Sequence, residues 1–178
     1  MRRFLLFIFL ICMIGTMCSC SKNDSNEEYY TVSNKALDEE SNRIKDLFLE
    51  SLSDNDVDKL QNEFSSFVKE NVNLKDEINN AFGFIDGNIT SIGSAITGLS
   101  AAETDEKGYV RADYEVSLFN VKTDKNRNYE IRIYGIFFYR NNEHKQGINR
   151  ISIFDNDIEY DAATEYGKFT VGVVGSEL

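Results

Sequence analysis

The sequence predicts an α+β fold in which three N-terminal helices cover one face of a curved antiparallel sheet. Two observations predict it. Apolar residues recur at helical spacing up to about residue 85, and in the segments that follow they alternate with polar residues. Helical and extended patterns do not alternate along the chain, which disfavours a parallel sheet with crossover helices. We therefore expect a single domain over residues 33–178, after a leader at 1–19 and a flexible tether at 20–32.

Each of the three helical patterns has one apolar stripe and one polar face, which is typical of helices that cover a core. The patterns lie at about 33–52, 57–68 and 74–85. Asp54 or Asp56 is placed to cap the exposed amides at the start of the second helix, and Asn73 those of the third. We expect each pattern to form one continuous helix.

The extended segments follow in an order that is typical of a meander. They lie at 87–100, 109–120, 128–140 and 147–154, and 168–174 is a candidate short edge strand. The first contains Gly93 and Gly98, which we interpret as bends or bulges. The third is apolar on both faces at its centre, which predicts an interior strand.

The second face of this interior strand is the main candidate interaction surface. It carries Tyr134, Ile136 and Phe138, flanked by Arg132 and Arg140. Two interpretations stay open: the C-terminal tail or a curled sheet edge covers this face, or it is a dimer or partner surface, because exposed apolar patches seldom go unused. In the second case the two arginines would lie at the rim and meet acidic groups.

The N-terminus has the order of a secretory leader. Arg2 and Arg3 precede an apolar run from Phe4 to about Met17, and this run is shorter than the ~20 residues that a membrane-spanning helix needs. The length therefore favours a signal peptide over a permanent transmembrane anchor.

The stretch Met17-Cys18-Ser19-Cys20 resembles the lipobox of bacterial lipoproteins, in which a small residue precedes a cysteine that receives a diacylglyceryl group. The resemblance implies cleavage after Ser19 and lipidation of Cys20, although Met17 and Cys18 depart from the common pattern. A disulfide across one intervening residue would be strained, and a metal site would lack further ligands nearby. Plain signal cleavage and an uncleaved anchor remain the alternatives.

Composition limits the classes of partner and chemistry. The formal net charge is −11, so the chain lacks the basic surface that nucleic acid requires. All three cysteines, Cys12, Cys18 and Cys20, lie in or beside the leader, which leaves the domain no disulfide. We find no metal-ligand cluster, nucleophile elbow or phosphate loop, and therefore expect no metal, cofactor or catalytic residue.

Several stretches together resemble a known family. The lipobox is followed by "LFLESLSDNDVDKLQNEFS", "FGFIDGNITSIG" and "YEIRIYGIFFYRNNEHKQGINRISIF". This order resembles a family of small lipoproteins from anaerobic Gram-positive bacteria, catalogued as a domain of unknown function, with a nuclear-transport-factor-2-like or cystatin-like fold. The resemblance covers most of 35–155 and implies a cone whose helices and sheet enclose a pocket. It brings no established activity.

These observations lead to two functional hypotheses. The first is a lipid-anchored binding or interaction module, outward of the cytoplasmic membrane on a Gram-positive cell surface, with a small ligand, a protein partner or a second copy of itself. The alternative is a small-molecule isomerase or dehydratase that uses a pocket of the same fold. Asp86, Asp113, Tyr114 and Tyr134 are the groups that could serve it, but fold analogy is its only support.

Overall fold

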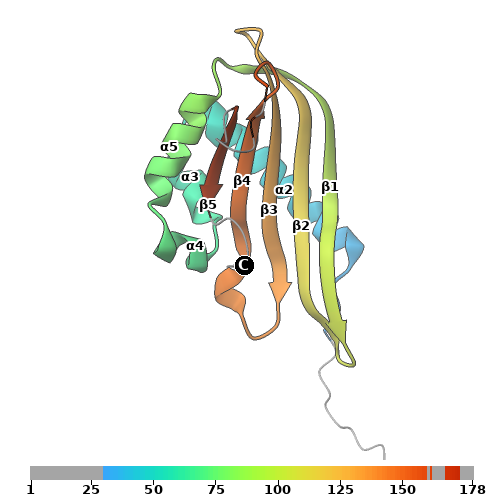
Figure 1. Ribbon diagram of the computed structural model, residues 1–178. Coiled ribbons are helices and arrows are strands. Elements are labelled where there is room, and N and C mark those ends of the chain that lie inside the picture. The colour runs from blue at the N-terminus through green and yellow to red at the C-terminus, as the bar shows by residue number, and fades with distance from the viewer. Residues whose placement is uncertain (1–29, 160, 162–166, 173–178) are drawn as a thin grey trace, which may run out of the picture.

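The computed structural model describes residues 30–159, 161 and 167–172, and Figure 1 labels the elements. The helices are α2 (Asn34–Asp54), α3 (Val57–Asn62), α4 (Ser66–Asn71), α5 (Leu74–Phe84) and the short 3-10 helix η1 (Glu143–Lys145). The strands are β1 (Ile89–Asp105), β2 (Gly108–Thr123), β3 (Asn128–Tyr139), β4 (Gly147–Asp155) and β5 (Lys168–Gly172). The α+β class is confirmed. The predicted leader, the tether up to residue 29 and Cys20 lie outside the described residues.

The five strands form one antiparallel sheet in the order β1-β2-β3-β4-β5, so each strand pairs with its neighbours in the sequence. Figure 1 shows that the sheet is curved and open, with β1 and β5 at its two edges. The edges differ in length, because β1 has 17 residues and β5 only 5. The predicted meander and the short edge strand near residue 168 are confirmed.

The core lies between the helices and one face of the sheet, as the apolar stripes predict. In Figure 1, α2 crosses behind the sheet and α5 lies beside β5. On the helix side, Leu37, Ile44 and Phe48 of α2 are buried, and Ile131 and Ile133 of β3 face them within the same apolar cluster. Among the described residues, no helix is long and apolar enough to span a bilayer.

The second predicted helix is not continuous, so four α-helices stand where three were expected in the described chain. The chain leaves the helix to bond with the start of β4: the Ser65 amide donates to the Ile148 carbonyl, and the Ile148 amide donates to the Glu63 carbonyl, both at 2.9 Å. The Ser65 hydroxyl then accepts from the Val68 amide and caps α4. Contacts with a strand more than eighty residues away therefore divide the apolar stripe into two helices. Asp56 caps α3, as predicted.

A glycine at the centre of the sheet makes room for a buried tyrosine. Gly135 of β3 pairs directly with Tyr114 of β2. A Cβ atom at position 135 would lie 2.2 Å from Cζ of Tyr114, so no larger residue fits without movement. The Tyr114 hydroxyl is fully buried, and no hydrogen-bond partner for it lies among the described residues. Burial raises the pKa of this phenol.

The first described residue, Tyr30, is held against the hairpin that joins β1 to β2. Its amide donates to the Lys107 carbonyl and its carbonyl accepts from the Tyr109 amide, both at 2.9 Å. The Arg140 guanidinium stacks on the Tyr30 ring at 4.4 Å and binds both carboxylate oxygens of Asp105 at 2.9 and 3.0 Å. These bonds lower the pKa of Asp105. Tyr30 is therefore fixed at the end of the sheet where β1 turns into β2, near the hairpin drawn at the lower right of Figure 1.

Candidate ligand-binding site

A cavity of about 470 Å³ lies at the opposite end of the domain, where α2 and α5 end and β1 begins. We call it the α2–α5–β1 cavity. Its apolar walls are Leu49 and Leu52 of α2, Phe82 and Ile85 at the end of α5, and Ile89 and Ile92 of β1. Its polar rim consists of Ser53, Asn55, Asn79 and Asn88 with the backbone at Gly83 and Gly87. A volume of this size suits a small organic ligand.

Two turns fix the rim. Asn55 takes the left-handed conformation that ends α2, with its amide directed back to the carbonyls of the last turn. Gly87 also has a positive φ of 92°, and a Cβ atom there would lie 2.3 Å from a carboxylate oxygen of Asp124. Asp124 accepts from the amide and side chain of Asn88 at 2.9 and 3.1 Å, and these bonds hold the pKa of its carboxyl below the ordinary value.

The lining residues limit the chemistry of the cavity. None of the described residues that line it has an ionisable side chain, although charged residues make up 28% of the chain. A charged ligand would lose its hydration there without gaining an opposite charge, which is costly. An uncharged ligand can instead place its apolar body against the walls and bond with the asparagine amides and the serine hydroxyl at the rim. The cavity thus favours a small neutral molecule.

The groups that the enzymatic alternative requires do not come together in the structure. The Asp113 carboxylate is paired with Arg111 at 2.6 Å. Asp86 lies near the other end of β2, where its amide donates to the Tyr129 hydroxyl. Tyr114 pairs with Gly135 while Tyr134 pairs with Glu115, so the two tyrosines occupy opposite faces of the sheet. No acid–base pair forms from these groups.

Residues 47–165, about two-thirds of the chain, match the family described as "Domain of unknown function (DUF5104)". The chain belongs to this family. The matched region includes every residue that lines the α2–α5–β1 cavity, so the cavity lies within the family domain. No curated protein matches the sequence.

The predicted interaction face of β3 is divided by a bulge. Ile136 pairs with Asp113 and Phe138 with Ala112, so Phe137 is an extra residue and the alternation of faces reverses there. Tyr134 and Ile136 stay on the face away from the helices, where Ile136 is only 2% exposed. Phe138 lies on the other side, with its ring 5.7 Å from that of Tyr30.

The arginines of that predicted face already have partners within the chain. Arg132 binds Glu130 and lies over the Phe154 ring at 5.5 Å. Arg140 binds Asp105 and Tyr30 on the side of Phe138. The structure therefore brings Arg132, Tyr134 and Ile136 together and places Phe138 and Arg140 apart from them.

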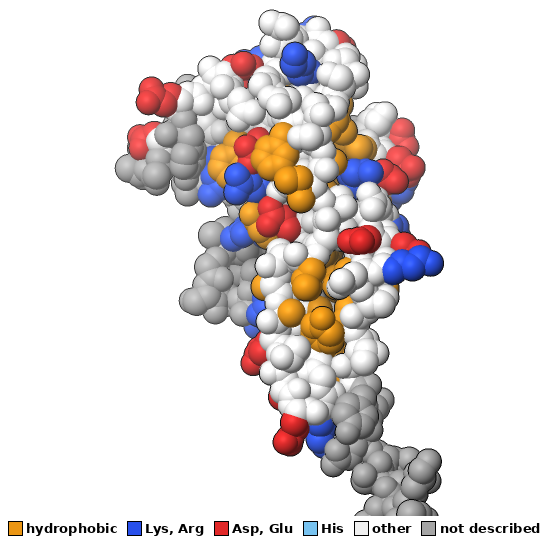
Figure 2. All heavy atoms as spheres, turned by 90° about the vertical axis from the view of Figure 1, so that its right-hand side faces the viewer, with side chains coloured by type: hydrophobic (Ala, Val, Ile, Leu, Met, Phe, Trp, Pro, Cys, Tyr) orange, Lys and Arg blue, Asp and Glu red, His pale blue; other side chains and the backbone are white. Residues whose placement is uncertain are grey.

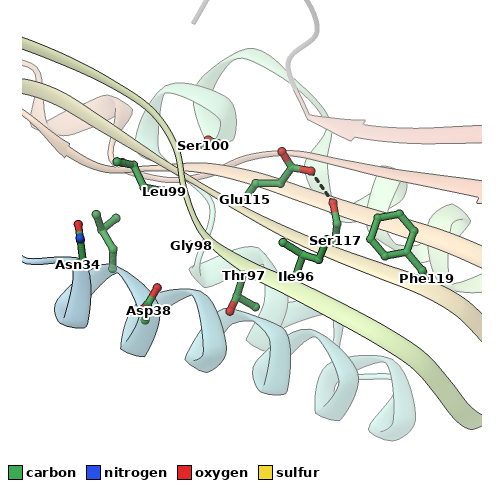
Figure 3. Close-up of a pocket in the computed structure, with 11 residues that line it drawn as sticks. Asn34, Asp38, Ile96, Thr97, Gly98, Leu99, Ser100, Glu115, Ser117 and Phe119 are labelled. Carbon is green, nitrogen blue, oxygen red and sulfur yellow. Dashed lines mark hydrogen bonds between the residues drawn. The ribbon is translucent and has the colours of Figure 1, made fainter.

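A second hollow, of about 460 Å³, follows the β1 edge, and we call it the edge groove. It is lined by Asn34, Leu37 and Asp38 of α2, by Ile96–Ser100 of β1, and by Glu115, Ser117 and Phe119 of β2. Figure 3 shows α2 on one side of β1 and the β2 side chains on the other, with Glu115 accepting from Ser117. The groove therefore straddles the edge strand.

The family resemblance implied a pocket between helices and sheet, but the sequence identified the lining residues of neither hollow. The cavity draws its walls from three elements, and only the bent strand "GNITSIG" gave a local signal, since its glycines marked a bend beside Ile89 and Ile92. Ile96 and Leu99 gave no local signal either, because they are three residues apart and do not share a face of an alternating strand, and scattered apolar residues of this kind are common on protein surfaces.

Proposed function

We propose that the protein is a lipid-anchored extracytoplasmic binding module, and that a small uncharged molecule with an apolar body occupies the α2–α5–β1 cavity. The observation that carries this proposal is the lining of the cavity, which combines six apolar side chains with amide and hydroxyl groups and has no ionisable side chain among the described residues. Such a lining discriminates against charged solutes and offers hydrogen bonds at one end.

The position of the cavity supports a tethered binding role. The chain enters the domain at Tyr30, beside the hairpin that follows β1, whereas the cavity lies at the start of β1. Because β1 has 17 residues, and a strand rises ~3.3 Å per residue, about 50 Å separate these two ends. A domain anchored through Cys20 would hold its cavity away from the bilayer and accessible to solutes.

We also propose that the fold is of the nuclear-transport-factor-2-like type. Helices cover one face of a curved five-stranded sheet, and a cavity remains between the two layers at one end. These features support that assignment.

A neutral fluorescent probe tests the ligand site. N-phenyl-1-naphthylamine is added to residues 21–178, and its emission should rise and shift to the blue as it leaves water. Ile92→Trp, which fills the cavity, should abolish this change. Ile96→Trp is the matched control, because Ile96 lies on the same strand but is 64% exposed, outside the cavity. Unchanged probe binding by a folded Ile92→Trp variant would contradict the proposed site.

A separate experiment tests the anchor. Cys20→Ala in the full chain should abolish incorporation of labelled fatty acid and move the protein from the membrane fraction to the soluble one. Cys12→Ala removes a cysteine of the leader outside the lipobox and serves as control. Labelling that persists in Cys20→Ala would overturn lipid anchoring at this residue and leave the cavity experiment unaffected.

A further inference from the structure

We propose that the exposed edge of β1 is a dimerisation site, at which a second copy of this chain adds its own β1 in antiparallel orientation. The two five-stranded sheets would then form one continuous sheet across a twofold axis. The edge of β1 from Ser91 to Leu99 shares only Ile92 with the lining of the ligand cavity.

The β1 edge lacks the features that normally protect an edge strand. Such strands are usually short, charged, interrupted by proline or covered, because their free backbone groups attract other strands. None of the 17 residues of β1 is buried, and residues 88–102 include neither a charged residue nor a proline. Ile96 and Leu99, at 64% and 44%, are the exposed large hydrophobic residues of the described chain.

The opposite edge shows what a protected edge looks like in the same sheet. The β5 strand has only 5 residues, and α5 lies beside it. The Gly172 amide at its end donates to the Glu77 carboxylate of α5 at 2.8 Å. Within the part of the chain that the structure describes, only the β1 edge is open over a long stretch. A twofold pairing through β1 would use that edge and close the assembly as a dimer.

The β1 sequence is complementary to itself. From Ser91 to Leu99 the strand keeps a single register with β2, and the register shifts of β1 lie outside this stretch. If this stretch pairs antiparallel with its copy around Ala95, each large side chain meets a small residue. The opposed pairs are then Ile96 with Ser94, Leu99 with Ser91, and Ile92 with Gly98.

Electrostatics also favours this part of the surface for a second copy. Two molecules that each carry a net charge of −11 repel each other, and the repulsion is reduced where the contacting stretch, residues 88–102 of β1, has no charged residue, although Asp38 and Glu115 line the groove beside it. Figure 2, which views the molecule from the β1 side, shows hydrophobic side chains gathered there within a mostly white surface.

The edge groove has the shape that a paired strand requires. Side chains of an added strand alternate between the two faces of a sheet. One row would lie beside Leu37 and Asp38 of α2, and the other beside Ser117 and Phe119 of β2 (Figure 3). The groove therefore offers space on both sides of the edge.

Cysteine cross-linking in membranes that contain the full chain tests the proposal. In the antiparallel pairing, the two Ala95 Cα atoms would lie ~4.5–5.5 Å apart, within the range that a disulfide spans. The chain has cysteines only at positions 12, 18 and 20, so wild type measures the background. Ala95→Cys, with mild oxidant, should give several-fold more dimer on a non-reducing gel than Glu70→Cys, an exposed control on α4.

Two further variants decide between the outcomes. Ile96→Lys added to Ala95→Cys should suppress the dimer, because it places two like charges across the axis. The thermal unfolding midpoint of the reduced protein, measured at a dilution where the dimer dissociates, should stay unchanged because Ile96 is exposed. A scan of cysteines from Ser91 to Leu99 allows for a shifted register. If no position in the scan exceeds the Glu70→Cys control, or if the adduct has the mass of another protein, the second-copy proposal is overturned.

Discussion

Tyr114 and Tyr129 are two buried tyrosines whose hydroxyl groups have opposite hydrogen-bonding states. Each side chain is 1% exposed. The Tyr129 hydroxyl accepts from the Asp86 amide at 2.9 Å and donates to the Phe84 carbonyl at 3.3 Å. The Tyr114 hydroxyl has no partner among the described residues. Removing the hydroxyl should therefore change stability in opposite directions at the two positions.

The magnitudes follow from the cost of an unpaired polar group. A buried hydroxyl without a hydrogen bond costs about 1–3 kcal/mol, so Tyr114→Phe should raise the free energy of unfolding by about 1–2 kcal/mol. Tyr129→Phe loses two bonds and leaves the Asp86 amide without its acceptor. It should lower the free energy of unfolding by about 1–2 kcal/mol.

Equilibrium urea unfolding of wild type and both variants measures these changes. The denaturant dependence should stay the same, because neither variant changes the surface exposed on unfolding. Comparing the two variants with each other cancels the change in unfolding free energy that any buried tyrosine-to-phenylalanine replacement causes. If Tyr114→Phe destabilises the protein as much as Tyr129→Phe does, the Tyr114 hydroxyl has a bonding partner such as an ordered water, and the reasoning is wrong.

Three further predictions concern contacts of the folded domain at Tyr114, Gly135 and Arg140. Burial raises the pKa of the Tyr114 hydroxyl above its ordinary value near 10, so this hydroxyl loses its proton first in the unfolded state. The free energy of unfolding should therefore fall as pH rises above about 10, and fall less steeply in Tyr114→Phe. Urea unfolding across that pH range measures the difference. Gly135→Ala should destabilise the domain by about 1–3 kcal/mol through its clash with Tyr114, and unfolding with an unchanged midpoint would contradict this. Arg140→Ala should free the segment at Tyr30, seen as faster amide exchange at Tyr30 and Tyr109, whereas Lys145→Ala should leave both rates as in wild type.

Local periodicity predicted most of the elements because each strand pairs with its neighbour in the sequence. Alternation in the segment 109–120 placed Tyr114, Val116 and Leu118 on the core face, and all three are buried there. The break between α3 and α4 could not be predicted in this way. It depends on backbone bonds between Ser65 and Ile148, and the apolar spacing around Phe64 is the same whether or not those bonds form.

The candidate sites were less predictable than the fold, because small backbone irregularities decide which side chains meet. One extra residue at Phe137 moves Phe138 from the side of Ile136 to the side of Tyr30, although the sequence alternates without a visible break. The cavity depends instead on where three elements end. Leu52 and Ile92 come together only because α2 stops at a left-handed Asn55 and β1 begins nearby.

Packing against the core explains the composition of β1 at Ile89 and Ile92 but not in the exposed stretch that follows. A strand with no buried residue in an acidic protein would remain soluble with charged side chains at every exposed position, and charges there would also protect the edge. Between residues 88 and 102 the chain instead has only glycine, alanine, serine, threonine, asparagine, isoleucine and leucine. Glu103 and Asp105 appear only where the strand reaches its hairpin. Since neither the core nor solubility requires the uncharged stretch beyond Ile92, that part is best explained by a contact made through the edge itself.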